Sequence, residues 1–248
     1  MKKTITMLFA LCGIAAAETV DLLASPGDWN RYETTISDGT LQGSGQWAGG
    51  YATYTLDTPI TLNYNMTLEL SYTMTFINKS DVAGTVALHS SSDVLAFGAK
   101  TYNGGDNDAP FCIGYSEDES AINANAITFG EGYGYRLSSY QETPVTAGIA
   151  GKIDNTTASH SIKEIITWRD EVQKYVATIY VDKVYAGEQT LGSSYTLEKI
   201  SVASSGNHEQ WRSQPSFSDM QIKLVPEPTT ATLSLLALCG LAARRRRK

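Results

Sequence analysis

Apolar and polar residues alternate along much of the chain. Between residues 67 and 76 every second residue is apolar, and Thr, Glu and Ser fill the positions between them. A period of two over this length predicts a half-buried β-strand, because successive side chains of a strand point to opposite faces. A preceding strand is predicted over residues 51–62, broken at Pro59, and residues 63–65 form the turn that joins the two strands.

Short runs of apolar and β-branched residues, separated by turn residues, continue this pattern. They predict strands over residues 84–89, 94–97, 111–115, 126–129, 160–168, 175–185, 195–201 and 217–224. The charged segment 169–174 separates two of these runs and predicts a hairpin turn. We find neither an amphipathic helix nor an internal repeat between residues 18 and 224. Many short strands with short turns indicate a β-sandwich and argue against an α/β fold.

Composition agrees with this interpretation. The chain has 248 residues, of which 42% are hydrophobic and only 18% are charged, so it can bury a core. Collagen, coiled-coil and disulfide-rich classes are excluded. Cys12 and Cys239 lie in the terminal segments, which leaves Cys112 without a partner for an intramolecular disulfide. Its apolar neighbours predict a small buried side chain, and no histidine lies nearby in sequence to activate it as a nucleophile.

The first residues have the pattern of a secretory signal peptide. Lys2 and Lys3 precede an uncharged run of 14 residues, 4–17, that ends in small residues. Ala15 and Ala17 predict cleavage before Glu18, so residues 1–17 are the expected signal peptide. A retained anchor is the alternative, but the run is short for about 30 Å of hydrocarbon.

The end of the chain combines three features in a fixed order. Two prolines flank Glu227, the uncharged stretch 231–243 follows, and five cations end the chain. A helix over this stretch would be only about 20 Å long, which makes it a marginal membrane anchor, and the cations would hold the C-terminus in the cytoplasm. The residues that define these features are Pro226, Glu227, Pro228, Arg244, Arg245, Arg246 and Arg247.

Residues 225–248 resemble a PEP-CTERM sorting signal of exported bacterial proteins. The resemblance implies recognition and removal of the tail by an exosortase-type membrane enzyme, after signal peptidase has acted at the other end. The alternative is a basic amphipathic tail that arose by chance, although its arginines are terminal and not spread along one helix face.

Removal of both terminal segments changes the charge. It takes away seven of the 19 Lys and Arg and one of the 26 Asp and Glu, so residues 18–224 carry a net charge of −13. Such an acidic domain is an unsuitable partner for nucleic acid or an anionic membrane surface. Cations or neutral glycans suit it better.

A second resemblance concerns the predicted hairpin. Residues 160–168 and 177–183 resemble the hairpin of laminin-G-like, concanavalin A-like domains, although Lys183 stands where glycine is usual, and residues 217–222 are similar to the last strand of that fold. The resemblance implies an all-β, two-sheet jelly-roll sandwich over residues 18–224, to which the tail adds one short C-terminal apolar helix.

The sequence carries no recognisable catalytic motif. Glycanases of this fold carry Glu-x-Asp-x-x-Glu on one strand, and that pattern is missing. The cluster at Glu117, Asp118 and Glu119 lacks the spacing and is interpreted as a solvated turn. His89, His160 and His208 show no zinc-ligand spacing, and no serine-nucleophile elbow or phosphate-binding loop is present.

Two kinds of binding residue remain as candidates. Asp106 and Asp108 lie in an oxygen-rich segment that could bind calcium, with a flexible polar loop as the alternative. Trp47 and Trp211 stand among small and polar residues and could stack on sugar rings, or they could cap the core. Tyr135 and Arg136 could line a ligand cleft or belong to a loop packed on itself.

The sequence therefore predicts a non-catalytic carbohydrate-binding or matrix module, exported and sorted to the outer surface of a Gram-negative bacterium. Calcium is the only cofactor that the sequence suggests. The expected partners are signal peptidase, an exosortase-type enzyme, the membrane that holds the tail and an extracellular polysaccharide, with no nucleic acid. A glycan-degrading enzyme of the same fold and a purely structural surface protein are the alternatives.

Overall fold

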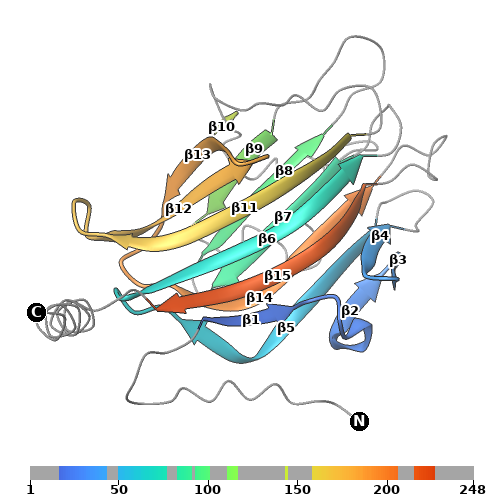
Figure 1. Cartoon of the computed structure of the whole chain (residues 1–248), viewed down its shortest axis with the longest axis horizontal. Coiled ribbons are helices and arrows are strands. Elements are labelled where there is room, and N and C mark those ends of the chain that lie inside the picture. The colour runs from blue at the N-terminus through green and yellow to red at the C-terminus, as the bar shows by residue number, and fades with distance from the viewer. Residues whose placement is uncertain are drawn as a thin grey trace, which may run out of the picture.

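The computed structural model describes residues 17–43, 50–76, 83–90, 93–100, 111–116, 143–144, 158–205 and 215–226. Over these ranges the protein is an antiparallel β-sandwich of two facing sheets (Figure 1). Its helical content there is one turn of 3-10 helix, Pro26–Asp28. No helix among these residues is long and apolar enough to cross a membrane. The all-β prediction is confirmed; the signal peptide, the strand at 126–129 and the C-terminal helix fall outside the described residues.

The first sheet has eight strands (Figure 1). Its order is β13 (Val184–Thr190), β12 (Lys174–Val181), β11 (Ala158–Arg169), β6 (Met66–Phe76), β15 (Ser216–Pro226), β4 (Thr40–Gly43) and β3 (Thr34–Ser37), and β1 (Glu18–Asp21) also pairs with β15. The first and last described strands thus lie side by side, with Glu18 opposite Leu224.

The second sheet has seven strands and lies behind the first in Figure 1. Its order is β10 (Thr143–Pro144), β9 (Phe111–Ser116), β8 (Val94–Lys100), β7 (Ala83–Ser90), β14 (Thr196–Ser205), β5 (Gly50–Thr61) and β2 (Trp29–Tyr32). The chain crosses between the sheets repeatedly. For example, β4 and β5 are consecutive in the sequence but belong to different sheets.

The core lies between the two sheets and follows the predicted alternation. In β6 the even-numbered residues from 68 to 74 are buried, and β11 continues this face with Ile162 and Ile166. The facing sheet contributes Val86, Leu88, Phe97, Ile200 and Val202, all fully buried. Trp29 is also buried, and its indole nitrogen donates to the Leu22 carbonyl at 2.8 Å. Trp168 is half-buried at the rim of this core.

Three details correct the sequence predictions. The run 175–185 is two strands, because Asp182 and Lys183 adopt positive φ of 51° and 69° and turn the chain between β12 and β13. The break at Pro59 is wrong: β5 runs unbroken, and a register shift against β14 between Leu197 and Lys199 accommodates the missing N–H of proline. The four-residue strands before residue 44 were too short to predict from alternation.

Candidate functional site

The hydroxyl of Ser204 marks one end of the sandwich. Ser204 lies near the end of β14 and is fully buried. Its Oγ accepts a hydrogen bond from the Gly43 N–H at 3.1 Å and donates one to the Pro215 carbonyl at 2.5 Å. Ser204 is also the register partner of Gly50. This end of the sandwich, the Ser204 end, therefore joins the last residue of β4, the first of β5 and the residue before β15.

The segments that carry the candidate residues Trp47 and Trp211 both begin and end at the Ser204 end. Residues 44–49 link Gly43 to Gly50, and residues 206–214 link Ser205 to Pro215. Trp47 belongs to the first segment and Trp211 to the second. Both tryptophans lie outside the described residues, but the strands bring the stems of their segments together at one buried hydroxyl. Sequence alone could not show this, because the two segments are far apart along the chain.

The candidate calcium segment leaves from the same end. Lys100, the last residue of β8, pairs with Ala83, which in turn pairs with Ser205. Asp106 and Asp108 follow Lys100 and lie outside the described residues. Within the described ranges no group of three or more His, Cys, Asp or Glu could hold a metal ion.

The segment that carries Tyr135 and Arg136 leaves from elsewhere. It follows Ser116 of β9, whose register partner is Val94, the first residue of β8, so its stem is at the end opposite Ser204. Tyr135 and Arg136, like Glu117 and Glu119, fall outside the described part of the chain. The strand order therefore does not group this pair with Trp47 and Trp211.

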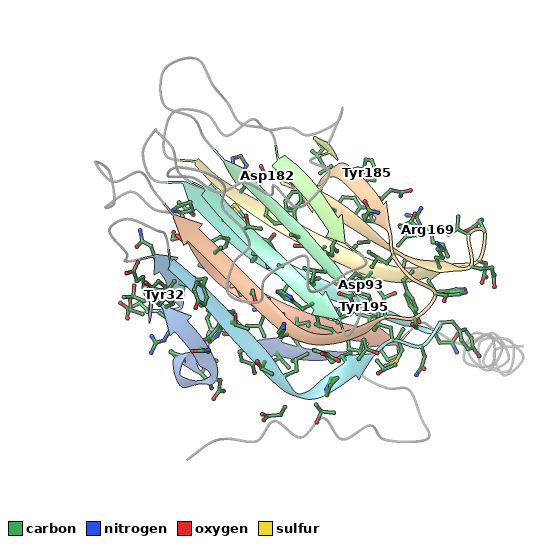
Figure 2. All side chains as sticks on the ribbon, turned by 180° about the vertical axis from the view of Figure 1, so that it is seen from behind. Tyr32, Asp93, Arg169, Asp182, Tyr185 and Tyr195 are labelled. Atoms are coloured by element: carbon green, nitrogen blue, oxygen red, sulfur yellow. The ribbon has the colours of Figure 1, made fainter. Side chains whose placement is uncertain are left out.

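A pair of stacked tyrosines lies directly beside the Ser204 end. Tyr32 of β2 pairs across the sheet with Tyr51 of β5, the residue after Gly50. Their ring centroids are 5.3 Å apart and the ring planes differ by 19°. Tyr32 is 49% exposed (Figure 2). The sequence does not predict this pair, because β2 is short and β3 and β4 separate it from β5 along the chain.

Next to these tyrosines, the outer face of the seven-stranded sheet carries small side chains. Ala203 and Thr85 follow Tyr51 across β14 and β7 in register, and Ala87 and Ala96 lie in the neighbouring row. All four residues are at most 2% exposed. Among the described residues, the middle of this face is therefore closed to solvent, whereas Asn30 and Tyr32 at the β2–β5 edge are exposed.

His160 and Asp182 form a hydrogen-bonded pair near the same end. The His160 Nδ1 lies 2.8 Å from one carboxylate oxygen of Asp182, and the other oxygen accepts the Ser161 N–H at 2.9 Å. The Asp182 N–H donates to the Ser161 carbonyl at 2.8 Å, so the contacts clamp the β12–β13 turn (Figure 2) onto β11. The clamp fixes Asp182, the first of the two residues with positive φ in this turn, and Lys183 is the second.

A second acidic group is buried between the sheets. Glu164 is 1% exposed, and one of its carboxyl oxygens accepts a hydrogen bond from the Tyr72 hydroxyl at 2.9 Å. Its other oxygen has no hydrogen-bond partner among the described residues. Burial raises the pKa of Glu164 to about 8, although the Tyr72 hydrogen bond opposes the shift. Burial and the neighbouring carboxyl also raise the pKa of Tyr72. Glu164 is a core residue and faces no open groove.

Comparisons with known proteins place the fold. No family model matches the chain, and no curated protein matches it. Among solved structures, the globular domain of T. cruzi calreticulin aligns with a TM-score of 0.50 and 12% identity, over 88% of this chain and 90% of that one. The lectin UEA-II complexed with galactose gives 0.44 and 14%, over 87% and 100%, and the Bauhinia forficata lectin in complex with GalNAc gives 0.42 and 10%, over 85% and 98%.

At these identities the likeness concerns the fold. The protein is an antiparallel sandwich of two β-sheets, as the sequence predicts, and its fold is similar to that of the calreticulin globular domain.

Proposed function

We propose that this protein is a non-catalytic module that binds a neutral carbohydrate outside the cell. The observation that carries the proposal is the convergence at Ser204, which joins the stems of the Trp47 and Trp211 segments beside the stacked Tyr32–Tyr51 pair, of which Tyr32 is exposed. Loops held by a rigid sandwich are a common place for binding residues. Aromatic rings suit sugars because the C–H faces of a pyranose are apolar and weakly positive, whereas the ring face is negative.

Charge supports a neutral ligand. The region between the two terminal segments carries −13, so an anionic polysaccharide would be repelled over long range. If calcium takes part, Asp106 and Asp108 would supply the hard oxygen ligands that this ion prefers. Metal binding would then add to sugar binding at the same end, since that segment also starts beside Ser205.

The test is affinity electrophoresis of the full chain, purified in mild detergent, through gels that contain different neutral polysaccharides, with and without a calcium chelator. We expect retardation without release of reducing sugar, and weaker retardation for Trp47→Ala and Trp211→Ala. Release of reducing sugar would instead show the glycan-degrading alternative. Absence of both effects would favour a structural surface protein, and loss of retardation on chelation would identify a calcium-dependent site.

The proposed location follows from the two terminal segments. We infer export by signal peptidase processing before Glu18, transient anchoring in the inner membrane by residues 231–243, and removal of the tail by an exosortase-type enzyme. Replacement of Arg244, Arg245, Arg246 and Arg247 by Ala should alter membrane retention or the mature mass in the producing bacterium. Unchanged fractionation and mass would refute this role for the tail.

A further inference from the structure

The tyrosine pair presents one aromatic face to solvent. Strand β2 is the last strand of its sheet, so no further strand lies beyond Tyr32 among the described residues. The centroid distance of 5.3 Å is close to the spacing of neighbouring strands, about 4.8 Å, and the rings are nearly parallel. The two rings therefore face each other across the strand pair. One face of Tyr32 is covered by Tyr51, and the other is directed away from the sheet edge.

Polar groups accompany this ring on the same face. Asn30 precedes Tyr32 by two positions, so both side chains lie on one face of β2. Asn30 is exposed and is the register partner of Thr53, whose hydroxyl lies 3.0 Å from the Ser201 hydroxyl. Within the described ranges, neither the Asn30 amide nor the Tyr32 hydroxyl makes a hydrogen bond. An aromatic face and an amide with open donors and acceptors are thus side by side.

We propose that Tyr32, supported by Tyr51, stacks on the apolar face of one pyranose unit of a neutral polysaccharide, while Asn30 hydrogen-bonds the hydroxyls of that or the next unit. This inference rests on the proposed function and names residues for it. The free face of the one Tyr32 ring matches one sugar unit in size, whereas a stable protein partner would need roughly 800 Å² on each side. Tyr51 holds Tyr32 in place, so less side-chain freedom is lost when the ligand binds.

The experiment compares tyrosines of similar exposure at different places. Tyr185, 46% exposed, lies on the eight-stranded sheet, where its ring packs edge-on against Tyr180, and Tyr64, 67% exposed, lies in the β5–β6 turn. We would measure affinity electrophoresis of the full chain on a neutral β-glucan, a galactomannan and a xyloglucan. For Tyr32→Ala we expect at least about tenfold weaker binding, which corresponds to about 1.4 kcal/mol.

Matched variants define the mechanism. Tyr32→Phe should bind nearly as well as the wild type, because the ring face remains, and Asn30→Ala should bind a few-fold more weakly. Tyr185→Ala and Tyr64→Ala should leave the affinity unchanged. Tyr32→Leu keeps an apolar side chain without the ring and guards against a folding defect, and unfolding midpoints of all variants would be compared.

The outcomes separate the two proposals. If Tyr32→Ala and Tyr32→Leu both bind polysaccharide with wild-type affinity, the tyrosine site is overturned and the carbohydrate function remains in place. Equal losses for Tyr32→Ala and Tyr185→Ala would overturn it as well. A wild-type protein that binds none of the polysaccharides would overturn both proposals.

Discussion

On the outer face of the eight-stranded sheet, polar side chains pair with one another across strands, whereas the outer face of the seven-stranded sheet carries small buried ones. The first face includes an ion pair between Lys163 and Glu69 at 3.0 Å and a hydroxyl pair between Thr67 and Thr167 at 3.2 Å. At its far edge Arg169 (Figure 2) contacts Glu188 at 2.8 Å. These side chains satisfy each other and remain in contact with water.

The second face gives a different picture. Ala87, Ala96 and Ala203 are fully buried there, and even Ser201 is only 6% exposed. Both faces of this sheet are therefore shielded at its centre. Among the described residues of this face, Asn30 and Tyr32 at the β2–β5 edge are exposed.

This difference supports the site proposed at the β2–β5 edge. A saturated polar face offers a sugar little that water does not, because each new hydrogen bond replaces an existing one. The β2–β5 edge combines an exposed ring with polar groups that lack protein partners among the described residues. The difference between the two faces can be tested by making the same kind of substitution on each of them.

The largest effect is expected from one added carboxylate on each face. Ala87→Glu would place a charge where the side chain is fully buried, and we expect a loss of about 3–5 kcal/mol in the free energy of unfolding. Ser71 is half-exposed on the outer face of β6, opposite Lys163. Ser71→Glu should therefore change the free energy of unfolding by less than about 0.5 kcal/mol. Urea unfolding of both variants provides the measurement. Similar losses at both positions would contradict the difference between the faces.

The next largest expected effect is on the pH dependence of stability, and it comes from Glu164 on the inner face of the eight-stranded sheet. Its pKa is about 8 in the folded protein, against 4.5 for an ordinary glutamate, so between these pH values the folded state holds a proton that the unfolded state has lost. Stability therefore falls as pH rises through this window, and the cost stays constant above it. From about pH 5 to about pH 8 the loss should be on the order of 3 kcal/mol.

Glu164→Gln provides the control for this titration. The amide keeps an acceptor for the Tyr72 hydroxyl but cannot ionise, so the stability difference between variant and wild type should move in favour of the variant as pH rises. Urea unfolding at a series of pH values measures it. Parallel pH profiles for the two proteins would show that Glu164 does not titrate in this range.

The fold was largely predictable because burial imposes alternation on the long strands. The pattern in residues 67–76 identified the buried face of β6, and residues 217–224 lie within β15. The turn at Asp182 and Lys183 escaped prediction because its support is a tertiary contact, the Asp182 clamp onto Ser161 and His160. Glu164 was not singled out either: it follows Lys163 in an ordinary charged pair, and its partner Tyr72 is 92 residues away.

The candidate site was predictable only in parts. Trp47 and Trp211 stood out by their polar surroundings, and their positions as ligand contacts remain predictions. Their common anchor at Ser204 depends on pairing between β14, β4, β5 and β15, which local patterns do not encode. Tyr32 and Tyr51 likewise meet only through the β2–β5 register.

A smaller effect is expected at Gly50, where the chain enters the seven-stranded sheet after leaving the other one. A Cβ at Gly50 would overlap the backbone carbonyl of Glu33, so the backbone must shift. Gly50→Ala should cost about 2 kcal/mol, whereas Gly27→Ala, with nothing within 4 Å of the added carbon, should cost less than about 0.5 kcal/mol. Thermal unfolding would measure both. Equal melting temperatures would show that this crossing tolerates a side chain.

The smallest effect concerns the ion pair on the eight-stranded sheet. Lys163 is 43% and Glu69 22% exposed, so water and salt screen their attraction. Lys163→Met should lower the free energy of unfolding by about 0.5 kcal/mol or less at low salt, and the difference should shrink further in about 1 M NaCl. The double variant with Glu69→Gln completes a mutant cycle. A coupling energy well above about 1 kcal/mol would mean that this outer face is more protected from water than its half-exposed side chains indicate, and the contrast between the two sheets would then weaken.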